Sequence, residues 1–363
     1  MAYTTINKSS DYFNTKLYTG NGGTQSITGV GHQPDFTWIK QRDNGAYSHM
    51  AFDAVRGVGK SIIPDTNAAE GNQTNGITAF GTDGFSIGDF SAGNYNGRNY
   101  VAWNWKAGGG QGSSNTDGSI NTTYTSANTT AGFSISKYVG TGSTATVGHG
   151  LGAVPKMLII KDLSASTDWT IYHVGVNQAT PSNSAQSRMV LNTTASSEGD
   201  GSFFNNTTPT SSVFTIGSSS AVNLSGRNYV CYAFTDIVGY SKFGSYMGNG
   251  NPDGTFIYLG FKPAFVMFKR SDGGTENWAL LDSTRSYANV SNHTLAANSS
   301  NAESSFGGGE SVFGASNKVD ILSNGIKIRE ASAYNNTSGA AYIYMAFAEA
   351  PLVGTNGVTA KAR

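Results

Sequence analysis

One segment of the chain matches the loose pattern of a phosphate-binding loop. It runs from Ala54 to Ser61 and ends in a Gly-Lys-Ser step, with Ala54 in place of the first Gly. Such a loop wraps backbone N–H groups around a phosphate, and it needs a strand before it and a helix after it. The flanking residues show no helical periodicity, and Asp282–Arg285 repeats the Asp-x-x-Arg spacing of Asp53–Arg56 without the Gly-Lys-Ser step. We therefore expect a structural turn with a local ion pair here, and no nucleotide site.

The side chains that most often bind metal ions are scattered. A zinc site needs three or four converging ligands, and a calcium site needs several carboxylates within a few residues. No two His lie four residues apart, and each Asp before a Gly is a lone acid that turn chemistry explains. The sequence therefore predicts no metal site and no cofactor. The residues in question are His32, His49, His149, His173 and His293, with Asp83, Asp117, Asp253 and Asp272.

Acids decide whether the chain is a glycosidase, since glycoside cleavage needs a pair of carboxyl groups around the bond that breaks. The glutamates are few and dispersed, so we expect no catalytic residues and no enzyme, while a pair brought together in space stays open as an alternative. They are Glu70, Glu198, Glu276, Glu303, Glu310, Glu330 and Glu349.

Two tryptophans each begin an expected strand, at Trp169–Tyr172 and Trp278–Leu281. A Trp at the start of a strand could stack on a sugar at the surface, or it could be buried in the core. Because the position occurs twice in the chain, we favour the core. The lone Cys231 rules out a disulfide within the chain, and its place within a repeated apolar phrase favours packing over reactivity.

The elements that must position these residues occur three times. In each copy a Tyr-x-Gly-x-Gly phrase precedes a Pro-led apolar run that ends in Lys, and an aromatic phrase follows. A unit of about 110 residues has the size of a single domain. What occurs in all copies is therefore interpreted as scaffold, and what occurs in one copy as decoration or function. The copies are Tyr18–Gly22, Pro34–Lys40 and Gly97–Trp105; Tyr138–Gly142, Pro155–Lys161 and Gly226–Phe234; and Tyr246–Gly250, Pro263–Lys269 and Gly339–Phe347.

The aromatic phrase alternates with the period of a β-strand. Val101, Trp103 and Trp105 point one way, Tyr100 and Ala102 the other, and the two later copies match. The Pro-led runs are nearly continuous apolar segments, typical of strands buried on both faces. Helical periodicity is hard to find. The sequence predicts an all-β chain of three tandem antiparallel β-sandwich modules of jelly-roll or lectin-like type.

The repeats set the expected organisation. Residues 1–108 form module 1, residues 109–131 a flexible linker rich in Gly, Ser, Thr and Asn, residues 132–238 module 2, and residues 239–363 module 3 with a short C-terminal tail. The tight join near residue 238 suggests that modules 2 and 3 pack together while module 1 is tethered.

Composition narrows the function classes. Lys plus Arg is 23 and Asp plus Glu is 23, without the basic excess that a nucleic-acid-binding protein shows. The first residues lack the apolar stretch of a secretory signal, and no apolar run has the roughly 18 residues of a membrane helix. We expect no nucleic-acid partner and no membrane insertion.

Several phrases resemble a family of repeat-containing, tail-fibre-like structural proteins of marine tailed bacteriophages. They are Asp11–Thr15, Tyr18–Ile27, Gln33–Phe36, Trp38–Lys40, Tyr100–Lys106 and Gly239–Tyr246. The resemblance spans nearly the whole chain. It implies a virion structural protein with lectin-like sandwich domains, placed on the particle exterior after assembly in the host cytoplasm, and it carries over no catalytic residue.

Three readings follow from the resemblance and the neutral, hydroxyl-rich composition. The first is a tail-fibre or adhesion component that contacts the host surface, with a surface glycan as a candidate partner, as a homotrimer alongside other virion proteins. The second is a capsid decoration or capsid fibre protein, in which three linked modules form a pseudo-threefold unit. The third is a polysaccharide depolymerase. No ligand-binding residue is singled out.

Overall fold

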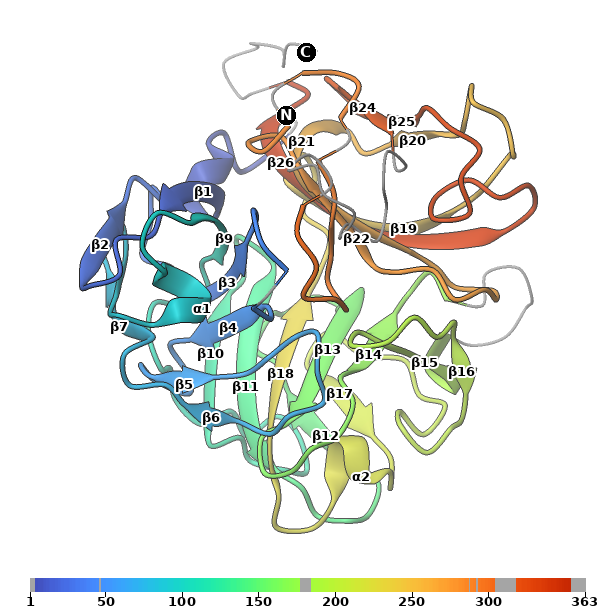
Figure 1. The fold of residues 1–363 in the computed structure, drawn as a ribbon. Coiled ribbons are helices and arrows are strands. Elements are labelled where there is room, and N and C mark those ends of the chain that lie inside the picture. Colours follow the sequence, from blue (N-terminus) through green and yellow to red (C-terminus); the bar gives the residue numbers. More distant parts are fainter. Residues whose placement is uncertain are drawn as a thin grey trace.

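The computed structural model describes residues 4–45, 47–176, 184–286, 288–291, 293–303 and 318–353. Glu310 and the tail from residue 354 onward lie outside these residues. The regular secondary structure of the described chain is nearly all β-strand, which confirms the all-β fold class (Figure 1). Its helical pieces are single turns: η1 (Ser9–Asp11), α1 (Ser91–Asn94), η2 (Ser184–Gln186) and α2 (Ser220–Asn223). No helix of the described residues is long and apolar enough to cross a membrane.

Two antiparallel sheets contain most of the strands of the first repeat. The larger has the order β1 (Phe13–Thr19), β9 (Asn99–Trp105), β3 (Phe36–Gln41), β4 (Met50–Asp53). The smaller has the order β2 (Gln25–Thr28), β8 (Gly84–Ile87), β7 (Ile77–Gly81). A short pair, β5 (Lys60–Ser61) with β6 (Gly71–Asn72), lies in the connection.

The second repeat keeps this plan and lengthens the large sheet at both ends. Its order is β10 (Tyr124–Asn128), β11 (Phe133–Val139), β18 (Asn228–Phe234), β13 (Met157–Asp162), β14 (Thr170–His173), β15 (Ser187–Val190), β16 (Glu198–Gly199). The small sheet is β12 (Ala145–Gly148) with β17 (Val213–Ile216).

The third repeat again has a large and a small sheet. The large one runs β19 (Ser241–Met247), β26 (Ala341–Pro351), β21 (Phe261–Arg270), β22 (Ala279–Asp282), β23 (Leu295–Ala296). The small one runs β20 (Phe256–Tyr258), β25 (Gly325–Ile328), β24 (Val319–Leu322). In all three large sheets the aromatic-phrase strand lies between the Tyr-Gly strand and the Pro-led strand.

The central strands of each large sheet are buried on both faces, as the Pro-led runs predicted. The face with Trp103 and Trp105 joins one hydrophobic cluster, and the face with Tyr100 and Ala102 joins a second cluster with the repeat's own small sheet. The later repeats divide their residues in the same way. The predicted alternation of β9, β18 and β26 is therefore confirmed.

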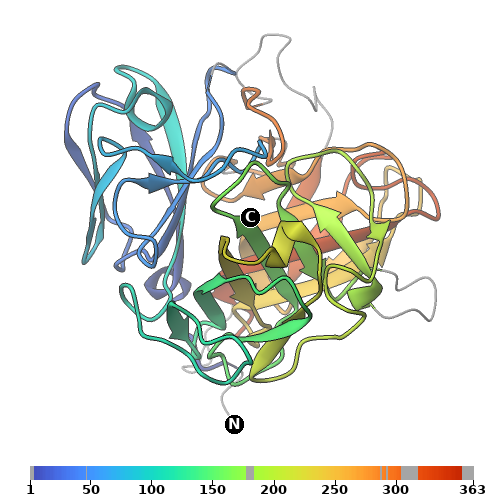
Figure 2. The ribbon, with the colours of Figure 1, turned by 90° about the horizontal axis from the view of Figure 1, so that it is seen from below.

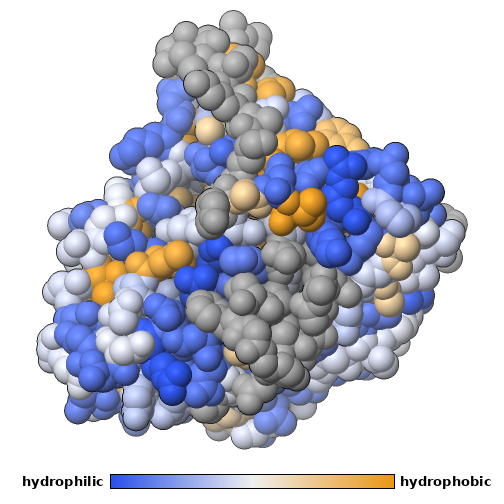
Figure 3. Space-filling view, turned by 45° about the horizontal axis from the view of Figure 1, so that its top comes forward, coloured by the Kyte–Doolittle hydropathy of each residue, from blue (hydrophilic) through white to orange (hydrophobic). Residues whose placement is uncertain are grey.

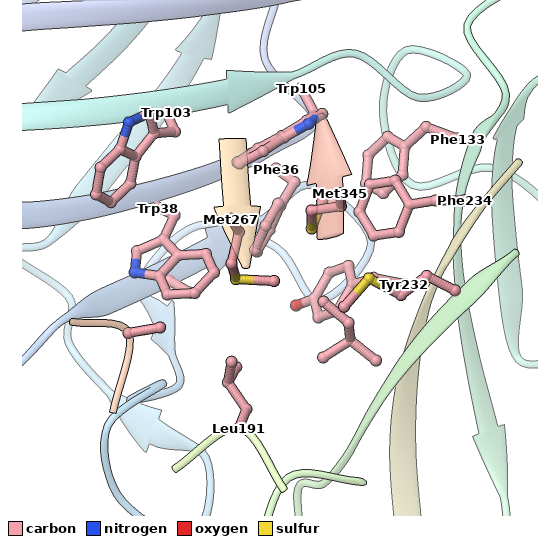
Figure 4. Packing of buried hydrophobic residues seen from close by; sticks show 14 of the residues in the cluster. Phe36, Trp38, Trp103, Trp105, Phe133, Leu191, Tyr232, Phe234, Met267 and Met345 are labelled. Atoms are coloured by element: carbon pink, nitrogen blue, oxygen red, sulfur yellow. The ribbon is translucent and has the colours of Figure 1, made fainter. Parts of the chain in front are cut away.

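The first of these clusters is shared by all three repeats. Aromatic side chains of β3 and β9 meet those of β11 and β18 and the methionines of β21 and β26 (Figure 4). Phe36 packs on Tyr232 with ring centroids 4.4 Å apart, and Phe13 on Phe347 at 5.2 Å. Burying one such side chain contributes about 1.5–3 kcal/mol. The blue, green and orange-red parts of the chain accordingly meet at the middle of the molecule in both ribbon views (Figures 1 and 2).

Residues 109–131 differ from the flexible tether that their composition suggested. Gly109 and Gly110 donate their N–H groups to the carboxylate of Asp35 at 2.9 and 2.7 Å. Farther along, β10 joins the large sheet of the second repeat. Small residues here allow the chain to pack closely against neighbouring backbone. The same composition is typical of disordered linkers, so composition alone does not distinguish the two. The first repeat is held in the shared core, and the remaining predicted module boundaries stay predictions.

The Tyr-x-Gly-x-Gly phrases make the same set of contacts in each repeat. Tyr18 stacks on Tyr100 at 5.2 Å, and the hydroxyl of Tyr100 donates to the carbonyl of Ser91 at 2.8 Å. A buried Asn94 binds the Gly loop through its own side chain and backbone. The later copies repeat these contacts with Tyr138, Tyr229 and Asn223, and with Tyr246, Tyr342 and Asn336.

Candidate functional site

The three repeats are tied into a closed ring by side-chain donors at equivalent positions. Each donor stands just before the strand that pairs with the Pro-led strand of its repeat (β4, β14 or β22), and each donates a ring N–H to a carbonyl of the preceding repeat. The contacts are Trp169 Nε1 to Ile63 O at 3.1 Å, Trp278 Nε1 to Val190 O at 2.9 Å, and His49 Nε2 to Ala296 O at 2.9 Å. Trp169 and Trp278 are buried in this role, which confirms the core interpretation and leaves neither as an exposed sugar platform.

His49 takes the place of a tryptophan because it carries the same donor. Its Nδ1 accepts a hydrogen bond from Trp38 Nε1 at 2.8 Å, so the proton lies on Nε2, which faces the Ala296 carbonyl. Burial lowers the pKa of His49 well below its ordinary value. A neutral imidazole with both nitrogens bound is not available as a metal ligand.

A second set of contacts crosses the seams in the shared core. Tyr232 of β18 donates its hydroxyl to Asp53 Oδ2 at 2.6 Å, and Trp103 of β9 donates Nε1 to Asp282 Oδ2 at 3.0 Å. Both carboxylates are fully buried and pair with the guanidinium three residues on, Arg56 and Arg285. The segment that resembled a phosphate loop thus begins in a turn with a local ion pair, as expected.

At the third seam the equivalent two positions carry uncharged side chains. Met345 of β26 stands where the other repeats have Trp103 and Tyr232, and a thioether donates no hydrogen bond. Opposite it the chain has His173, whose Nε2 lies 3.0 Å from the carbonyl of Tyr344. Burial lowers the pKa of His173 to about 4. At this position of the repeat, the chain therefore has a carboxylate where the facing strand offers a side-chain donor and an imidazole where it offers none.

The Lys of the second and third Pro-led runs also donates hydrogen bonds to the preceding repeat. Lys161 Nζ donates to the carbonyls of Asn67, Asp162 and Thr167, and Lys269 Nζ to those of Thr194 and Arg270. Lys40 donates to the carbonyl of Gln41. Burial lowers the pKa of each of these three lysines to about 8.

The glutamates are dispersed among ion pairs. Glu303 is buried between Arg42 and Arg285, which hold the pKa of its carboxyl well below the usual range against the opposing effect of burial. Glu70 pairs with Arg56, and Glu198 with Arg188. Within the described residues, no group of three or more His, Cys, Asp and Glu converges as a metal site. Cys231 is buried, and burial raises the pKa of its thiol well above the ordinary value.

One face of the molecule is mainly polar where its residues are described (Figure 3). Figure 3 shows that blue and white residues predominate on this face and orange patches are small. Several recesses open on the described surface. One of about 280 Å³ lies beside Asn14 and Thr284, one of about 220 Å³ beside Lys242 and Tyr258, and one of about 290 Å³ between the first and second repeats.

The last of these, called the seam recess here, has the richest chemistry. It contains a carboxylate, a guanidinium, an amide and several hydroxyls over an aromatic ring. The guanidinium carbon of Arg188 lies 4.0 Å from the ring centroid of Phe203. Sequence reasoning missed the site, although one signal was present: β15 carries Arg188 where the other repeats have Ser61 and Thr294. The recess is lined by Asn67, Ser166, Thr167, Asp168, Arg188, Phe203, Ser219, Ser220 and Ala221.

Comparison with known proteins gives a family and no described activity. No curated protein and no solved structure matches the chain. A family model described as a domain of unknown function, DUF7483, matches residues 8–351. That range takes in all three repeats, so the chain belongs to the DUF7483 family.

Proposed function

We propose that this chain is a non-enzymatic structural protein of a bacteriophage virion, displayed on the particle exterior as a tail-fibre-like component that contacts the host surface. The phrases quoted in the sequence analysis suggest the virion. The ring of three repeats supports a structural role, because the chain's repeated residues are used to hold its own repeats together. Asp53, Asp282 and the buried tryptophans all act within the chain.

A second role, capsid decoration, is favoured by one specific observation. The shared core fills the middle of the ring with side chains of one chain, among them Trp105, Phe234 and Phe347. A single chain therefore presents three related units around its own pseudo-axis, which suits a partner with local threefold symmetry. In a homotrimeric fibre, the contacts between subunits would have to form on the outer faces of the ring.

Labelling intact particles tests the proposal. Antibodies against the purified chain should label the exterior of purified virions, at the tail for the adhesion role and over the head for the decoration role. The purified chain should bind host cells in the first case and emptied capsids in the second. Absence of the chain from purified particles would overturn the virion proposal in both forms.

Mass in solution separates the two roles further. Light scattering on the purified chain should give a trimer of the 38.0 kDa chain for a tail fibre and a monomer for a pseudo-threefold decoration unit. Release of reducing ends from host polysaccharide would favour a depolymerase instead.

A further inference from the structure

We propose that the seam recess binds one neutral monosaccharide unit, with Asp168 and Arg188 as the residues that recognise its hydroxyls. The inference rests on the proposed host-surface role, because a surface glycan is what such a role would meet. It names the site and the ligand class that the role leaves open.

The recess is preorganised by contacts below it. Lys161 Nζ donates to the carbonyl of Asn67 on one wall at 3.2 Å and to that of Thr167 on the other at 2.9 Å. The walls belong to two repeats, and Trp169, directly after Asp168, is bonded across the same seam. A ligand would therefore find its polar partners already placed, which lowers the entropic cost of binding.

Asp168 carries a charge that its structural role does not require. Its Oδ1 accepts a hydrogen bond from Asn192 Nδ2 at 2.8 Å. In the third repeat Asn277 makes the same bond, accepting from Asn298 Nδ2 at 2.7 Å, with an amide in place of the carboxylate. Asp168 Oδ2 accepts no hydrogen bond from the described residues, so it is available to accept from a ligand hydroxyl.

Arg188 supplies the complementary donors. Its Nε donates to Glu198 at 2.9 Å, and its planar group stacks over Phe203. These two contacts fix the guanidinium plane, while its terminal nitrogens make no hydrogen bond with the described residues. A fixed guanidinium beside a carboxylate suits neighbouring sugar hydroxyls, since each hydroxyl both donates and accepts.

The charge and the volume of the recess restrict the class of ligand further. Asp168 and Glu198 balance Arg188 and Lys161, so the site favours a neutral ligand over a phosphate or an acidic sugar. The rim adds hydroxyls of Ser166 and Ser220. A volume of about 290 Å³ lies at the lower end of ligand pockets and suits one sugar unit rather than a longer buried segment.

Ligand-observed NMR on the full chain tests the inference, with methyl glycosides of neutral hexoses as probes and N-acetylneuraminic acid and inorganic phosphate as anionic comparators. We expect at least one neutral glycoside to bind, and Asp168→Asn to weaken it at least tenfold, because an amide held by Asn192 presents N–H donors in place of Oδ2. Asp89→Asn is the matched control. That exposed carboxylate also accepts from an Asn side chain, Asn75 at 2.7 Å, but lies outside the recess.

A second variant guards against a folding defect. Ser166 is exposed and makes no hydrogen bond with the described residues, so Ser166→Trp should fill the recess, abolish binding and leave thermal unfolding unchanged. Unaltered binding in both Asp168→Asn and Ser166→Trp, a preference for the anions, or no binding by any neutral glycoside would overturn the inference. Particle labelling tests the virion proposal separately. If virions are labelled but the protein binds no sugar, only this inference is wrong. If the protein binds sugar but is absent from virions, only the virion proposal is wrong.

Discussion

Tyr232 of the second repeat donates its hydroxyl to the buried carboxylate of Asp53 in the first repeat, at 2.6 Å. The two residues are 179 positions apart. Asp53 also pairs with Arg56, so one carboxylate joins a local turn to a distant strand. The equivalent contact at another seam is Trp103 to Asp282. Two seams therefore contain the same kind of hydrogen bond to a buried carboxylate, with a tyrosine as donor in one and a tryptophan in the other.

Removing the donor at this seam should destabilise the whole protein. Tyr232→Phe leaves a buried carboxylate short of one hydrogen bond, at a cost of about 1–3 kcal/mol in the free energy of unfolding. Chemical denaturation measures it. Tyr240→Phe is the control, because that buried tyrosine donates no hydrogen bond to the described residues. Equal stability of the two variants would show that the seam contact contributes nothing.

Stability should rise with pH between about 8 and 9. Burial lowers the pKa of Lys40, Lys161 and Lys269 from the ordinary 10.5 to about 8. In that interval the unfolded chain binds more protons than the folded one, so raising the pH favours folding, by at most about 3 kcal/mol for each lysine. Denaturation at a series of pH values measures this, and a flat or falling profile from about pH 8 to about pH 9 would contradict it.

The same profile should turn downward at higher pH. Burial raises the pKa of Tyr100, Tyr229 and Tyr344 to about 12. As the pH approaches about 10, unfolded tyrosines and the unfolded Cys231 thiol lose their protons before the buried ones do, so the folded state loses stability. The optimum therefore lies between about pH 9 and about pH 10.

The Gly that follows each Tyr-x step should tolerate no side chain. A Cβ at Gly140 would overlap the carbonyl oxygen of Leu224, and the equivalent glycines face backbone in the same way. Gly140→Ala should therefore cost several kcal/mol or prevent folding, as overpacking against backbone does. Gly199→Ala is the control, since its nearest heavy atom is the Ser187 hydroxyl at 3.9 Å. Comparable thermal unfolding of the two variants would contradict the packing argument.

The sequence by itself determined the strands and their two faces. Period-two alternation in Tyr100–Trp105 and its copies is a local property of the chain, and burial on both faces follows from the continuous apolar runs such as Phe36–Lys40. The Asp-x-x-Arg turn was likewise visible, because its partners lie three residues apart.

Only the tertiary structure decided how the repeats meet. Residues 109–131 read as a tether because small polar residues serve equally in disorder and in close backbone contact, and only Asp35 shows which applies. The ring and the seam recess depend on side chains from separate repeats, such as Asn67 beside Asp168 and Arg188. Local pattern carries no information on which distant surfaces pack, since that choice rests on the complementary shape and hydrogen bonding of faces formed only after each sheet exists.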